Sequence, residues 1–182
     1  MSATELFPIH EQLGLKTIFL IRHAKSSWDS AALSDFDRPL NDRGKKDAPE
    51  MANRLLENKI RIDLFVSSPA KRARKTAAYF SKVFGKKEDK ILLVPELYQA
   101  DPAAFYLAIS GLENKYDHVA IFSHNPGITD FANSLTDTQV DDMPTCSIFC
   151  IKVFAEKWKN FEDARKEFLF FDFPKSKSGN EI

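Results

Sequence analysis

The chain has 182 residues, of which 43% are hydrophobic, and its 26 lysine and arginine residues are balanced by 26 aspartate and glutamate residues. This length and hydrophobic content predict one globular domain with a sizeable core. The charge balance excludes the global positive field of a general nucleic-acid or anionic-membrane binder, so any basic site must be local. No apolar run approaches the ~20 residues needed to span a bilayer, and the N-terminal stretch lacks a basic start, which favours a cytoplasmic protein.

Patterns typical of strands and helices alternate along the chain, with no internal repeat. Short apolar runs predict strands, and longer periodic segments with start signals predict helices. In chain order, we expect a strand over 17–21, a helix over 47–57, a strand over 62–66, a helix over 69–84, a strand over 90–94, a helix over 102–112, a strand over 118–122, a helix over 128–135, and strands over 146–154 and 167–173. Pro49 either sits in a first turn or kinks a longer helix that starts after Asn41.

This alternation predicts an α/β fold: a three-layer sandwich in which helices flank a mainly parallel central sheet. We expect a single domain over residues 1–182. Its core covers about residues 16–174, after an N-terminal extension over 1–15 and before a polar tail over 175–182.

The two cysteines, Cys146 and Cys150, fall in one strand-like run. Four extended residues span ~13 Å, well beyond disulfide reach. We therefore expect buried, reduced thiols, with a CxxxC metal pair as the alternative.

Three of the predicted strands are followed by cationic or titratable side chains. Arg22 and His23 follow the first strand, Arg72 comes shortly after the second, and His124 comes just after the fourth. The carboxyl ends of parallel strands meet at one edge of a sheet, where open α/β sheets bind their ligands. An arginine fork matches phosphate geometry, and a neutral imidazole can attack phosphorus. This edge therefore predicts a phosphate site with a histidine nucleophile.

The helix after the second strand breaks a local rule at its start. We predict Ser68 as its N-cap and Pro69 as its first residue. Its opening carries four cations where the helix dipole disfavours each by a few tenths to ~1 kcal/mol: Lys71, Arg72, Arg74 and Lys75. Helix N-termini present free N–H groups to anions, so a bound anion would compensate. We assign this role to Arg72 and expect the other three to form a solvated basic face.

Three motifs stand at these strand ends: Arg22-His23, S-S-P-x-x-R-A at 67–73 and S-H-N-P-G-I at 123–128. In this order and spacing, they resemble the histidine phosphatase superfamily, which has the phosphoglycerate mutase-like fold. The segments RHAKSSW at 22–28 and DRPLNDRG at 37–44 look like its SixA-type phosphohistidine phosphatase branch. The resemblance runs from about Lys16 through the final strand.

By this resemblance, His23 is the nucleophile that becomes transiently phosphorylated, and Arg22, Arg72 and His124 form the phosphate pocket around it. The resemblance also implies no metal and no organic cofactor. A metal site built from His23, His124 and a carboxylate is the alternative.

The chain departs from the family pattern at the proton donor. Many ester-cleaving relatives carry a glutamate where Gln99 stands here, and Glu96, three residues earlier, is an imperfect substitute. Aspartates in the loop after the nucleophile are further possible donors, or else parts of a plain polar loop: Asp29, Asp35 and Asp37. A general acid typically contributes about 10²–10⁴-fold, so its absence matters greatly for an alkoxide leaving group. It matters less for phosphohistidine, because a protonated imidazole leaves readily.

We therefore expect a cofactor-independent phosphatase that acts through phosphorylated His23, most simply on phosphohistidine in a protein. A small-molecule phosphomonoesterase and a weakly active phosphate-binding module are the alternatives. The partner is then a phosphorylated protein or a small phosphorylated metabolite, with neither nucleic acid nor a membrane as partner. Trp28, just past the nucleophile, either walls the pocket, contacts a protein substrate or covers the core.

Overall fold

The computed structural model describes residues 14–28 and 33–176. Its strands are β1 (Leu15–Arg22), β2 (Leu64–Ser67), β3 (Leu92–Leu93), β4 (His118–Ser123), β5 (Ile148–Phe154) and β6 (Lys166–Asp172). Its α-helices are α1 (Asp42–Glu57), α2 (Lys71–Val83), α3 (Pro102–Ser110) and α4 (Gly127–Leu135). Short 3₁₀-helices are η1 (Glu88–Lys90), η2 (Pro95–Leu97) and η3 (Trp158–Asn160).

The six strands form one sheet in the order β3-β2-β4-β1-β5-β6. The β1–β4, β2–β4 and β2–β3 pairs are parallel, whereas β1–β5 and β5–β6 are antiparallel. The predicted α/β sandwich with a mainly parallel sheet is confirmed. The connection between β5 and β6 is short and has no crossover α-helix, which parallel neighbours would need, so these two strands pair antiparallel.

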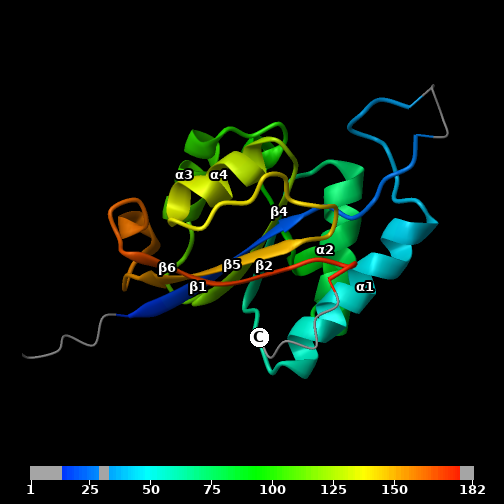
Figure 1. Cartoon of the computed structure of the whole chain (residues 1–182). Coiled ribbons are helices and arrows are strands. Elements are labelled where there is room, and N and C mark those ends of the chain that lie inside the picture. The colour runs from blue at the N-terminus through cyan, green and yellow to red at the C-terminus, as the bar shows by residue number, and fades with distance from the viewer. Residues whose placement is uncertain (1–13, 29–32, 177–182) are drawn as a thin grey trace, which may run out of the picture.

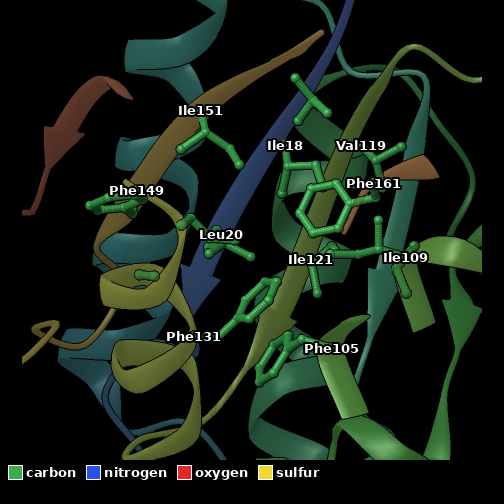
Figure 2. Close-up of a cluster of buried hydrophobic side chains, with 14 of the residues drawn as sticks. Ile18, Leu20, Phe105, Ile109, Val119, Ile121, Phe131, Phe149, Ile151 and Phe161 are labelled. Atoms are coloured by element: carbon green, nitrogen blue, oxygen red, sulfur yellow. The ribbon is translucent and has the colours of Figure 1, made fainter. Parts of the chain in front are cut away.

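Helices cover both faces of the sheet, α1 and α2 on one side and α3 and α4 on the other (Figure 1). Side chains of β1 alternate between the two sides, as the two-residue period of a strand requires. Ile18 and Leu20 pack with Phe105 and Phe131 in the core beneath α3 and α4 (Figure 2). Phe19 belongs to the second core, beneath α1 and α2. The two cores hold the central strands from both sides and so fix where the strands end.

Helix α1 begins at Asp42, so Pro49 lies inside the longer of the two helices considered from the sequence. The Asn41 side chain caps this helix by accepting a hydrogen bond from the Gly44 N–H at 2.9 Å. The cap explains why the helix starts before the proline.

Helix α2 begins two residues later than predicted, at Lys71, and its N-cap is Ala70 without a capping side chain. The prediction of Ser68 as the N-cap was wrong. The Ser68 hydroxyl accepts a hydrogen bond from the Ala70 N–H at 3.3 Å, and it lies 2.8 Å from Nε2 of His124. The serine therefore interacts with the end of a neighbouring strand, which local helix-start rules do not describe.

Several element ends also differ from the predictions. The strand predicted over 90–94 shrinks to β3, because the chain enters η2 at Pro95. The strand predicted from Cys146 begins at Ile148, because Cys146 has a φ of 64°, outside the extended region. Both cysteines are buried free thiols, as expected. No helix in the part of the chain that the structure describes has the length and apolar character to cross a membrane.

Candidate active site

The ends of β1, β2 and β4 are joined by backbone hydrogen bonds that continue past the strands. The His23 N–H donates to the Ser123 carbonyl at 3.0 Å, and the Ser68 N–H donates to the Phe122 carbonyl at 2.9 Å. Beyond these bonds lies a cavity of about 750 Å³. The structure brings four residues singled out in the sequence together on its wall: Arg22, His23, Arg72 and His124.

His23 is buried and its protonation follows from its two hydrogen-bond partners. Nδ1 lies 2.8 Å from the carbonyl oxygen of Ala24, which can only accept, so Nδ1 carries the proton. On the other side of the ring, Arg72 Nε donates to Nε2 at 3.2 Å. Burial lowers the pKa of His23 well below its ordinary value of 6.5, and neighbouring His124 lowers it further. His23 is thus a neutral imidazole with its lone pair on Nε2.

His124 lies beside His23, with 5.0 Å between the two ring centroids. Burial and, next, the charge of Arg72 lower the pKa of His124 to about 3. Nε2 of His124 contacts the Ser68 hydroxyl, whereas its buried Nδ1 has no hydrogen-bond partner among the described residues. When the Ser68 hydroxyl donates to Nε2, Nδ1 carries the proton and can donate it to a bound oxygen. A buried polar atom without a partner is costly, so a ligand that satisfies it is stabilised here.

Two arginines supply positive charge on the cavity wall. Arg22, at the end of β1, donates from Nη1 to Asp142 at 3.2 Å and to the Met143 carbonyl, while its buried Nε has no partner among the described residues. Arg72, in the first turn of α2, is 6% exposed. The other three cations at the start of α2 are exposed, as expected for a solvated face: Lys71, Arg74 and Lys75.

Arg72 is held by a carboxylate that the sequence analysis did not distinguish from its neighbours. Asp35 accepts from Arg72 Nη2 at 2.9 Å, from Arg38 Nη1 at 2.8 Å and from the Tyr98 hydroxyl at 3.0 Å. Its backbone carbonyl also accepts from Arg72 Nη1. Partial burial on its own raises the pKa of Asp35, but the Tyr98 hydrogen bond and the charge of Arg72 outweigh it and lower this pKa. Asp35 is therefore ionised.

Two of the possible proton donors named from the sequence, Glu96 and Asp37, are not among the residues that line the cavity. Glu96 is exposed in η2, and Asp37 is exposed and accepts from the Ser34 hydroxyl at 2.6 Å. Gln99 does line the cavity, as do three carboxylates: Asp35, Asp101 and Asp130. Asp29 lies outside the described residues.

No three His, Cys, Asp or Glu side chains within residues 14–28 and 33–176 are grouped as a metal site. A neutral His23 imidazole between cationic side chains is an arrangement that can attack phosphorus.

The family model of the histidine phosphatase superfamily (branch 1) matches residues 18–98, which include both His23 and Arg72. Over these residues the chain is similar to the histidine phosphatase superfamily. Among curated relatives, an uncharacterized chloroplastic protein of Arabidopsis thaliana is 28% identical over 79% of this chain and 69% of its own length. An uncharacterized protein of Mycobacterium leprae is 28% identical over 85% of this chain and its whole length.

Solved structures share the histidine phosphatase fold along nearly their entire length. The protein histidine phosphatase SixA, solved with tungstate, has a TM-score of 0.74 at 24% identity and covers 87% of this chain and 97% of its own. A mycobacterial glucosyl-3-phosphoglycerate phosphatase has a TM-score of 0.68 at 14% identity and covers 87% and 99%. At these identities, the likeness establishes the fold.

Proposed function

We propose that this protein is a histidine phosphatase that hydrolyses phosphohistidine in a protein through a phosphorylated His23. The observation that carries the proposal is the state of His23: neutral, with its proton on Nδ1 fixed by the Ala24 carbonyl and with Nε2 beside Arg72. A nucleophile in this state needs no base to activate it.

The reaction has two steps. In the first, Nε2 of His23 attacks the phosphorus atom, a new P–N bond forms, and the bond to the leaving group breaks. Arg22 and Arg72 hold the phosphoryl oxygens, and Nδ1 of His124 donates to one of them, so the charge is stabilised as it redistributes. In the second step, water attacks phosphorus, a new P–O bond forms and the P–N bond to His23 breaks. His23 leaves as neutral imidazole with its proton on Nδ1, and the two water protons remain on the inorganic phosphate that is released.

The leaving group distinguishes the substrates. The carboxylate next to Arg72, Asp35, is ionised and bonded to two arginines, so it has no proton to give to an alkoxide. A phosphohistidine that is protonated on its second ring nitrogen leaves as neutral imidazole without an external acid. Asp101 and Asp130 on the cavity wall disfavour negatively charged leaving groups through like-charge repulsion. The fold shared with SixA supports the same choice.

A small-molecule phosphomonoesterase is the second candidate. The cavity of about 750 Å³ lies within the range of small-ligand sites, and a mycobacterial glucosyl-3-phosphoglycerate phosphatase shares the fold. The two candidates differ in whether P–N or P–O bonds are cleaved faster.

A rapid-quench experiment tests the proposal. Wild type, His23→Ala and His118→Ala are mixed, in EDTA, with radiolabelled phosphohistidine protein and separately with p-nitrophenyl phosphate. His118 is the matched control, because it is bonded to Asp63 and lies off the cavity. We expect acid-labile phosphoenzyme with wild type and His118→Ala but not with His23→Ala, and faster turnover of phosphohistidine than of the ester.

Three results contradict the proposal. Label on His23→Ala would place the nucleophile elsewhere. Turnover of the ester but not of phosphohistidine would support the phosphomonoesterase. Binding of phosphate by wild type without turnover of either substrate would instead support a phosphate-binding module.

A further inference from the structure

An indole ring stands exposed on the cavity wall. Trp28 lines the same cavity as His23, yet 73% of its surface is accessible to solvent. Tryptophan is highly buried on average, and leaving an apolar ring in water forgoes a favourable burial term. A ligand in the cavity can cover this ring and recover part of that term.

One face of the ring is already occupied and its position is supported. The guanidinium carbon of Arg38 lies 3.3 Å from the ring centroid. Arg38 is 8% exposed, and it donates from Nε to the Ser27 carbonyl at 3.1 Å and from Nη2 to the Ser26 hydroxyl. Arg38, which is buried and held by hydrogen bonds, therefore covers one face of the indole. The other face is left for a ligand.

A chain of contacts through three residues connects the Trp28 ring to His23. Asp35 bonds Arg38 through one carboxylate oxygen and Arg72 through the other, at 2.8 and 2.9 Å. Arg72 in turn lies 3.2 Å from Nε2 of His23. Trp28 thus contacts Arg38, which is linked to Arg72 through two ion pairs with Asp35. A group attached to a phosphorus atom at His23 would lie in the same cavity that Trp28 lines.

We propose that Trp28 is a specificity-determining residue that stacks on the aromatic ring of the leaving group, which is imidazole in a phosphohistidine substrate. The assignment rests on the proposed function and names the part of the substrate that the site recognises. Aromatic rings prefer offset or edge-to-face contact, and a protonated imidazole adds cation–π attraction to the indole. Exposed Trp28 therefore favours leaving groups with rings over those without.

The test separates ring recognition from bond type. Steady-state kcat/KM is measured for wild type, Trp28→Leu and Trp28→Phe on a phosphohistidine peptide, on p-nitrophenyl phosphate and on phosphoramidate, which has a P–N bond but no ring. Leu107→Ala is the matched control, because Leu107 is 70% exposed on α3 and lies off the cavity.

We expect Trp28→Leu to lower kcat/KM about three- to tenfold for the two ring-bearing substrates and to leave phosphoramidate unchanged, because aromatic contacts contribute in this range. Trp28→Phe retains most of the preference, and Leu107→Ala matches wild type on all three substrates.

An equal loss on all three substrates would overturn the inference, since Trp28 would then only support Arg38, and so would no loss at all. A different result would contradict the proposed function: wild type that does not hydrolyse phosphohistidine. Even then, p-nitrophenyl phosphate compared with phosphoramidate still decides whether Trp28 stacks on a ring.

Discussion

Arg72 makes three contacts that join His23 to the segment that carries Asp35. It donates to Nε2 of His23 and to both the carbonyl and the carboxylate of Asp35. Its planar guanidinium group has the geometry to donate two parallel hydrogen bonds to phosphoryl oxygens. The residue therefore connects the nucleophile, the anion site and the loop that carries Asp35.

We expect Arg72→Ala to lower kcat/KM by about 10²–10³-fold, because removing one preorganised donor to a developing anion has this effect in other enzymes. Arg74→Ala removes the same charge from the same helix, but Arg74 is exposed, so its activity should stay within about twofold of wild type. The measurement is kcat/KM for phosphohistidine, with thermal denaturation to verify folding. Arg72→Ala activity above a tenth of wild type would rule out this role.

Sequence reasoning located the main side chains but not their supporting contacts. Arg22, His23 and His124 follow parallel strands, and the topology alone carries such residues to one edge. Asp35 lies in a loop without periodicity, where nothing in the order of residues tells whether it or Asp37 turns toward Arg72. That choice depends on the path of the chain in three dimensions.

The start of α1 is an element whose position bears on the nucleophile. A Cβ on Gly44 would lie 2.1 Å from the Lys25 carbonyl oxygen, far inside van der Waals contact. The Asn41 N–H donates to this same carbonyl at 3.0 Å. The helix therefore presses directly on the backbone that follows Ala24, whose carbonyl orients the His23 ring.

We expect Gly44→Ala to destabilise the protein by about 1–3 kcal/mol, as overpacking does, and to lower activity at least tenfold by displacing the segment after His23. Gly111→Ala is the control: its φ is −83° and the nearest atom lies 3.6 Å away, so its stability should change by less than about 1 kcal/mol. Urea denaturation and steady-state kinetics measure both effects. Equal behaviour of the two variants would disprove the close approach.

Element types were predictable because apolar runs and helix-start signals are local features of the sequence. The direction of β5 and β6 was not, since an apolar run predicts a strand without its orientation. The start of α2 differs for a related reason: the Ser68 hydroxyl contacts His124, a residue 56 positions away.

At the scale of the whole molecule, the two cavity histidines couple the unfolding equilibrium to pH. In the folded state, burial lowers both pKa values, that of His124 to about 3, whereas an unfolded histidine titrates near 6.5. Below pH 6.5 the unfolded state therefore binds more protons, and stability falls as the pH falls from 6.5 toward 3.

We expect the free energy of unfolding to decrease between pH 7.5 and 5.5 by about 1 kcal/mol for each of these histidines. Urea denaturation at the two pH values measures it, in a range where most carboxylates stay ionised. His124→Asn should remove about half of the decrease. Wild type that is equally stable at both values would show that the rings are not held neutral.

The contact between Asp35 and Arg72 has a consequence for the end of the catalytic cycle. Before any substrate enters, the guanidinium already has an internal anion as its partner. In the proposed reaction, inorganic phosphate, the product, must compete with this tethered carboxylate for the same donors. The cavity would thereby be a weaker trap for free phosphate than its arginines alone suggest, which favours product release.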